Sequence, residues 1–186
     1  RTSVDVAAPG VNILSTVPGG GSYTPSPGDI FYDDVEAGVG SWTADSPWAI
    51  IDTSSYSPTH SWTDSPSGNY NNDANVSLTS GIINLSGYAG QIIRVGFYAW
   101  VDIETYFDFL YIEGSGDGGT TWTSLGSLNG HQLSWTLYSF LVPQNLYTSQ
   151  FKFRFRLDSD STINYDGVYI DNIGVGIGTG SSNYES

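Results

Sequence analysis

Apolar and polar residues alternate in short segments along most of the chain, and no helical periodicity is sustained. In the clearest segment, residues 151–157, apolar side chains point to one face while Lys152, Arg154 and Arg156 point to the other. A period of two residues indicates strands with one buried face. The other segments with this pattern are residues 31–36, 48–52, 75–85, 91–101, 108–113, 121–125, 134–141 and 168–175. The chain is therefore predicted to be all-β, with about nine or ten strands.

The strand-like pattern occupies residues 30–176, which we expect to form one globular unit. Residues 1–29 contain small apolar residues followed by clustered proline and glycine, and they are predicted to be a linker. Residues 177–186 return to glycine and serine and are predicted to be a second linker. Short strands joined by tight turns favour a sandwich architecture for the middle unit.

The amino-acid composition limits the functions that the chain is expected to have. The chain is 39% hydrophobic and 15% aromatic, which is enough for a core without disulfide bonds, and it has no cysteine. Its formal net charge of −14 would repel a phosphate backbone, so nucleic acid is not an expected partner. No apolar run reaches the roughly 18 residues of a membrane span.

Residues 115–122 contain a serine, an aspartate, glycines and a final tryptophan at the spacing of an Asp box. In such a hairpin the aspartate caps a tight turn and glycine supplies a positive φ, so we interpret it as a folding device. No serine lies in a nucleophile motif, and His60 and His131 are too few for a zinc site. The chain is therefore predicted to be non-catalytic.

The first segment, residues 4–16, with Asp5, Val6, Ala7, Ala8, Pro9 and Gly10 at its centre, resembles a stretch of the subtilisin-like serine proteases, the subtilases. In that family the stretch lies shortly before the motif that carries the catalytic serine. The tail, residues 183–186, is similar to the residues that immediately precede that motif. The resemblance implies that the middle unit is inserted in a parent endopeptidase whose catalytic residues lie outside this chain.

The middle unit resembles the accessory β-sandwich domains of secreted bacterial subtilases and immune-inhibitor-A-type metallopeptidases, which are distantly similar to MAM and carbohydrate-binding jelly rolls. The landmarks that match in order are residues 31–36, Trp42, residues 61–70, 85–87, 117–122 and 166–173. The resemblance implies a jelly-roll-like antiparallel β-sandwich in a secreted protein. It also implies a calcium ion where the first strand, an early loop and the last strand meet.

Acidic residues are the predicted ligands, because calcium prefers hard oxygen donors. Asp34, Glu36, Asp64 and Asp171 occupy the positions that match the resembled calcium site, and Asp33 and Asp166 are additional candidates. The alternative interpretation is that these carboxylates are solvated turn residues or caps of backbone N–H groups.

The predicted function is that of a calcium-binding accessory domain, which would stabilise the parent protease or shape access of its protein substrate. The first alternative is a carbohydrate-binding module that anchors the protease to a glycan, with Trp48, Trp62 and Trp135 as candidate stacking rings. Trp100 and Trp122 are expected in the core. The second alternative is a structural or adhesion domain. The basic row of residues 152–156 is expected to pair with acids on neighbouring strands or to dock on the protease domain.

Overall fold

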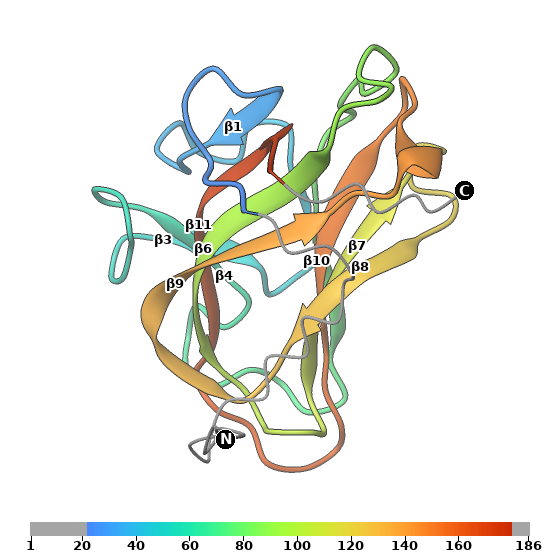
Figure 1. The fold of residues 1–186 in the computed structure, drawn as a ribbon. Helices are drawn as coiled ribbons and strands as arrows, with labels where there is room; N and C mark the ends of the chain where they lie inside the picture. Colours follow the sequence, from blue (N-terminus) through green and yellow to red (C-terminus); the bar gives the residue numbers. More distant parts are fainter. Residues whose placement is uncertain (1–21, 180–186) are drawn as a thin grey trace, which may run out of the picture.

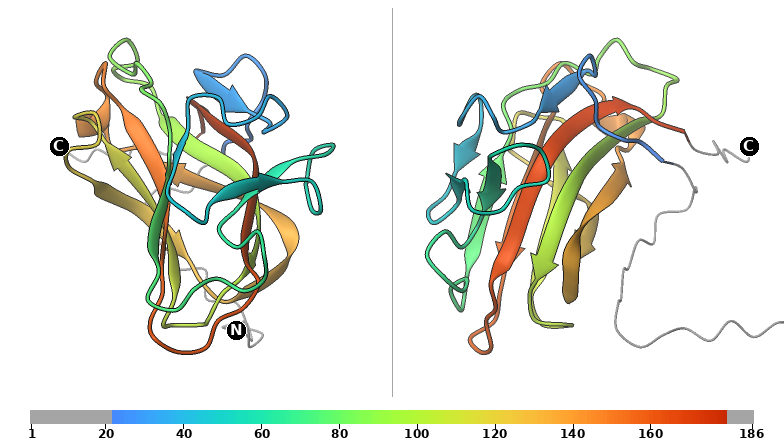
Figure 2. Two further views of the ribbon diagram at one scale, coloured as in Figure 1. Left: turned by 180° about the vertical axis from the view of Figure 1, so that it is seen from behind. Right: turned by 90° about the vertical axis from the view of Figure 1, so that its left-hand side faces the viewer.

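The computed structural model describes residues 22–179, which form two packed antiparallel sheets (Figures 1 and 2). Sheet A contains β1 (Phe31–Asp33), β3 (Ala49–Ile51), β4 (Ser61–Thr63), β6 (Ile93–Asp102), β9 (His131–Leu141) and β11 (Gly167–Ile177). Sheet B contains β2 (Thr43–Ala44), β5 (Asn75–Thr79), β7 (Phe109–Ser115), β8 (Thr123–Leu128) and β10 (Lys152–Asp158). A 3-10 helix, η1 (Gln144–Leu146), precedes β10, and no helix of the described residues is long and apolar enough to cross a membrane.

The strand order identifies a jelly-roll-like sandwich. Sheet A runs β3-β4-β11-β6-β9 with β1 paired to β11, and sheet B runs β2-β5-β10-β7-β8. Apart from the pairs β3–β4 and β7–β8, neighbouring strands are not consecutive in the chain, which crosses repeatedly between the sheets. The predicted all-β jelly-roll-like sandwich is confirmed. Residues 22–179 contain eleven strands rather than nine or ten, because β2 and β4 are too short to leave an alternating pattern in the sequence.

The core lies between the sheets and follows the alternation in the longest strands. Along β6 the residues at odd numbers from Ile93 to Val101 are buried, and on β10 the same holds for Phe153, Phe155 and Leu157. Phe97 of β6 meets Phe155 edge to face across the sandwich, with the ring centroids 4.7 Å apart. Burying one such side chain stabilises the fold by about 1.5–3 kcal/mol.

The packed unit is larger than residues 30–176. Residues 22–29 cross the outer face of sheet A, as the right-hand view of Figure 2 shows, and Tyr23 is only 6% exposed. The hydroxyl group of Tyr23 donates a hydrogen bond to Asp29 at 2.6 Å. At the two ends of the unit, Thr179 N donates to the carbonyl of Ser22 at 2.9 Å, and Ser22 N donates to Thr179 Oγ1 at 3.1 Å. The two ends of the packed unit therefore lie side by side. The subtilase-like segments, residues 4–16 and 183–186, lie outside the described part of the chain.

One predicted strand is shorter than expected, and one predicted turn forms as expected. The segment predicted over residues 75–85 ends as a strand at Thr79, and only an isolated bridge from Ile83 to Phe151 continues the pairing. The turn at residues 115–122 forms as the Asp-box spacing predicts. The Asp117 carboxylate accepts hydrogen bonds from the hydroxyl and N–H groups of Thr121, from Ser115 Oγ and from Thr120 N, and these bonds lower the pKa of Asp117.

Candidate functional site

Aromatic side chains gather on the outer face of sheet A. Tyr98 and Trp100 alternate along β6 with the buried residues and therefore point away from the core. Tyr169 of β11 pairs in register with Trp100, and their rings meet edge to face at 5.3 Å. We call this set the aromatic face; its members are Tyr56, Tyr98, Trp100, Trp135 and Tyr169.

Tyr56 comes from the connection between β3 and β4 and lies flat on the aromatic face. Its ring stacks on that of Tyr98 with centroids 3.7 Å apart and an angle of 10°, and Trp135 of β9 lies 6.2 Å from Tyr56. Tyr56 remains 45% exposed. The side chain of Tyr98 is hydrogen-bonded to Tyr56, which raises the pKa of Tyr98. The stacked pair is a flat ring surface with hydroxyl groups at its edge.

Asp171 holds the connection that carries Tyr56. This carboxylate is fully buried, and its Oδ2 accepts hydrogen bonds from the backbone N–H groups of Tyr56 and Ser57, both at 2.8 Å. Burial raises the pKa of Asp171, and the hydrogen bonds to Ser57, Asn172 and Tyr56 oppose that rise. In the structure, Asp171 positions the aromatic ring through the backbone on either side of it.

The other residues predicted to bind calcium fall into two groups. Asp34 and Glu36 contact the same connection as Asp171: the carbonyl of Asp34 accepts a bond from Ser57 Oγ at 3.3 Å, and Glu36 accepts from the Thr59 hydroxyl and from His60 N at 2.9 Å. Asp33 accepts from Trp42 Nε1 at 2.6 Å. Asp34, Glu36 and Asp171 thus contact residues 56–60, whereas Asp33 is hydrogen-bonded to Trp42 and to Val35 N.

Asp64 and Asp166 form the second group, beside the first residues of β11. Asp64 Oδ1 accepts a bond from Val168 N at 2.7 Å, and Asp166 Oδ2 accepts one from the Tyr169 hydroxyl at 3.0 Å. The carbonyl of Asp166 accepts a bond from Ser65 Oγ. Because Asp64 aligns with residue 168 of β11 and not with Asp171, the four predicted ligands do not converge within the described residues.

A cluster of three carboxylates was not foreseen from the sequence. Glu104, Asp108 and Asp160 each place an oxygen within 4.8 Å of the other two. Asp108 is buried, and its oxygens accept bonds from the Tyr70 hydroxyl at 2.5 Å and from Asp160 N at 2.8 Å. Glu104 Oε2 is buried and has no hydrogen-bond partner among the described residues. Burial, followed by the charges of Asp160 and Asp108, raises the pKa of Glu104.

The tryptophans do not lie where the sequence analysis placed them. Trp48 and Trp62, candidate stacking rings, are buried in the core, so neither ring has a face open to a ligand. Trp100 and Trp122, expected in the core, lie partly exposed on the outer faces of the two sheets. Trp100 has an even number on β6, whereas the buried residues have odd numbers. The alternation in the sequence therefore already indicated that Trp100 points away from the core. Trp135 is partly exposed.

The basic row lies on the outer face of sheet B, and two of its three members, Arg154 and Arg156, pair with acids, as expected. Arg154 and Arg156 both contact Glu113 of β7, at 2.6 and 3.2 Å, and Arg156 also contacts Asp158 at 2.7 Å. The guanidinium of Arg154 lies 4.3 Å above the ring of Trp122. The arginine side chains are therefore largely engaged within the domain.

The fold is that of known carbohydrate-binding and adhesin domains. The K2 cleaved adhesin domain of Lys-gingipain matches with a TM-score of 0.55 and 16% identity, over 77% of this chain and 96% of that domain. A family 22 carbohydrate-binding module of Clostridium thermocellum Xyn10B matches with the same score and identity, over 81% and 94%. A family 61 module solved with β-1,4-galactotriose matches with a TM-score of 0.52, over 77% and 94%.

A relationship to a protease is visible in sequence. Bacillopeptidase F of Bacillus subtilis (strain 168) is 31% identical over 107 residues, which is 57% of this chain. The match spans 7% of the length of that relative. No model of a known protein family matches the chain. The chain thus has a β-sandwich fold similar to that of these carbohydrate-binding and adhesin domains, and part of its sequence is similar to part of Bacillopeptidase F.

Proposed function

We propose that this chain is a non-catalytic accessory domain of a secreted subtilisin-like serine endopeptidase, and that its aromatic face binds a carbohydrate. The observation that carries the proposal is the group of partly exposed rings from β6, β9, β11 and the residue 52–60 connection. Sugars bind to flat rings by stacking, and hydroxyl groups at the ring edges supply hydrogen bonds. The parent would carry the catalytic triad and would be the principal partner of this domain.

The paired ends of the packed unit support its insertion in a larger protein. Ser22 and Thr179 are hydrogen-bonded to each other, so the unit can leave and rejoin a host surface at one point. Residues 4–16 and 183–186 would then belong to the subtilase fold on either side. The similarity to Bacillopeptidase F supports the same assignment.

The ligand assignment is tested by comparing two tryptophan variants on a glycan panel. Trp135→Ala removes a ring from the aromatic face, whereas Trp122→Ala removes a partly exposed ring from the opposite sheet. We expect saturable binding of at least one glycan by isothermal titration calorimetry, weakened by about tenfold or more in Trp135→Ala, a loss of roughly 1.4 kcal/mol. Trp122→Ala should bind normally.

Two results would contradict the carbohydrate assignment. One is the absence of binding to any glycan by a folded protein, which would favour a structural role. The other is binding of a denatured protein that requires Trp135, because the same face would then capture the substrate of the parent protease.

A second proposed function is calcium binding at Glu104, Asp108 and Asp160. The specific observation is that three carboxylates share one small volume, and none of them forms an ion pair with a cationic side chain of the described residues. Calcium takes six to eight oxygen ligands and would neutralise their repulsion. Asp34, Glu36 and Asp171, which contact residues 56–60, remain the proposed alternative site.

A further inference from the structure

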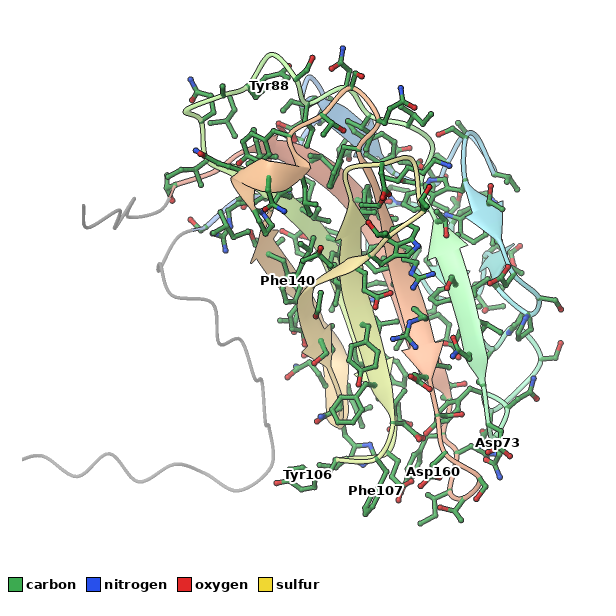
Figure 3. All side chains as sticks on the ribbon, turned by 90° about the vertical axis from the view of Figure 1, so that its right-hand side faces the viewer. Asp73, Tyr88, Tyr106, Phe107, Phe140 and Asp160 are labelled. Atoms are coloured by element: carbon green, nitrogen blue, oxygen red, sulfur yellow. The ribbon has the colours of Figure 1, made fainter. Side chains whose placement is uncertain are left out.

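The sandwich has an apolar tip at the turn between β6 and β7. Tyr106 and Phe107 are 63% and 62% exposed, and both project from the lower end of the molecule in Figure 3. Ile163, in the connection between β10 and β11, is 55% exposed. We call Tyr106, Phe107 and Ile163 the apolar tip. Adjacent large apolar side chains at this level of exposure mark an interaction site more often than isolated ones do.

A buried tyrosine fixes the two loops of the apolar tip relative to each other. The Tyr70 hydroxyl donates to Asp108 Oδ2 at 2.5 Å, lies 3.4 Å from the carbonyl of Ile163, and accepts a bond from Glu104 N at 3.0 Å. Asp108 Oδ1 accepts a bond from Asp160 N, which ties the second loop to the first. The apolar tip is thus held in place before any partner arrives, which lowers the entropic cost of binding.

The backbone conformation of Tyr106 is a second indication that the apolar tip is a functional site. Its φ is 74°, in the left-handed region where glycine or asparagine is favoured and a bulky side chain is strained. Strain of this kind is concentrated at ligand contacts and other functional sites. Here an exposed turn carries an aromatic ring at a position that glycine would occupy more easily.

The apolar tip has a strongly acidic border. The two loops, residues 103–108 and 159–166, contain Glu104, Asp108, Asp160 and Asp166 and have neither lysine nor arginine. Asp73, whose N–H donates to the carbonyl of Asp160, lies beside them (Figure 3). The negative potential excludes an anionic lipid surface and favours a cationic partner.

The apolar tip is also remote from the chain connections. Gly178, next to the paired ends, donates its N–H to the carbonyl of Ile92, at one end of β6. The turn with Tyr106 follows Asp102, at the other end of that strand. At about 3.3 Å per residue the two places are about 30 Å apart. A domain tethered at Ser22 and Thr179 therefore presents this end outward.

We propose that the apolar tip and its carboxylates form a docking site for a polypeptide segment that carries lysine or arginine beside apolar residues. The cation would lie against the rings of Tyr106 and Phe107, where cation–π attraction adds to the charge of Glu104 and Asp160. The apolar residues of the partner would cover the exposed rings and Ile163. This site lies at the end of the sandwich and adjoins the aromatic face, because Asp166 of its border accepts a bond from the Tyr169 hydroxyl. It goes beyond the proposed carbohydrate function.

Fluorescence anisotropy with two labelled decapeptides tests the site. The first peptide alternates lysine and leucine around a central glycine pair, and the second has glutamate in place of lysine. In EDTA at low salt we expect saturable binding of the lysine peptide only, weakened roughly tenfold or more in the double variant Tyr106→Asn, Phe107→Ser. Salt at about 0.5 M should weaken binding several-fold, because it screens exposed charges.

Two control variants separate this site from other causes. Ile82→Ser removes an equally exposed apolar side chain from the connection after β5, and Trp135→Ala tests the aromatic face; both should bind the lysine peptide as the unaltered protein does. Equal binding of the two peptides, or a double variant that folds and binds normally, would overturn the proposal. So would co-sedimentation with neutral phosphatidylcholine vesicles that needs Tyr106 and Phe107 while neither peptide binds.

Discussion

At the residue scale, burial controls the ionisation of the Asp64 carboxyl group. Its Oδ1 accepts the N–H of Val168, whereas its buried Oδ2 has no hydrogen-bond partner among the described residues. Gly167, at φ 93°, makes this approach feasible, because a Cβ there would collide with the carboxylate. Burial raises the pKa of Asp64 to about 7.

The raised pKa of Asp64 predicts how the stability of the protein changes with pH. The native state holds a proton on Asp64 up to about pH 7, whereas an unfolded carboxyl loses it near 3.8. The native protein therefore binds more protons between these values, and the contribution of Asp64 to stability falls as pH rises across that window, by about 4 kcal/mol in total. Above pH 7 the contribution stays at its low value.

Asp64→Asn keeps the acceptor for Val168 and removes the titration. Urea unfolding in EDTA at about pH 4.5 and pH 8 should show a smaller fall in stability for this variant than for the unaltered protein. Asp52→Asn, at an exposed carboxylate, should leave the profile unchanged. Parallel profiles for Asp64→Asn and the unaltered protein would mean that Asp64 is ionised throughout.

At the scale of elements, the segment of residues 22–29 depends on glycines in the strands below it. Gly96 and Gly174 are register partners on β6 and β11, and Gly176 follows on the same face. A Cβ at any of the three would run into Tyr23. Because these three glycines have no side chains, the ring of Tyr23 can pack directly on the backbone of sheet A.

Gly174→Ala should therefore loosen this segment. A methyl group would meet the Tyr23 hydroxyl, Pro25 and the carbonyl of Phe31, so we expect a loss of about 1–3 kcal/mol in unfolding free energy. Proteolysis between residues 22 and 29 should also become faster. Gly87→Ala is the matched control, because nothing lies within 4 Å of its Cβ position. An equal effect of both variants would show that the segment does not contribute to stability.

At the scale of the whole molecule, charge is the dominant property. The chain has 19 acidic residues against 5 lysines and arginines, and three of those cations lie on the outer face of sheet B. The end with Glu104, Asp108 and Asp160 therefore has little internal neutralisation. A bound divalent cation would relieve that repulsion in the native state alone.

Calcium should accordingly raise the melting temperature of the protein. At a hundredfold excess over Kd the stabilisation is about 2.7 kcal/mol, which corresponds to a shift of several degrees by differential scanning calorimetry. Glu104→Gln should abolish the shift, and magnesium should not reproduce it. If Glu36→Gln abolishes it instead, the ion binds beside residues 56–60, as the family resemblance implies. No shift after complete removal of metal by EDTA would exclude both sites.

Much of the fold follows from local sequence. The alternation in residues 91–101 and 151–157 determined which side chains of β6 and β10 enter the core, because a strand exposes every second residue to each face. The Asp-box spacing likewise determined the turn at Asp117, since the groups that donate to the Asp117 carboxylate all lie between Ser115 and Thr121. Charge and the absence of cysteine were equally independent of tertiary structure.

Only the tertiary structure decided which distant residues meet. Glu104, Asp108 and Asp160 come together because the β6–β7 and β10–β11 connections lie at one end of the sandwich, held by Tyr70. Asp171 anchors Tyr56 although 115 positions separate them. Trp62 is buried because β4 packs between β3 and β11, in a strand of three residues that leaves no periodic signal. Contacts of this kind depend on strand order and register, which alternation along a single segment does not specify.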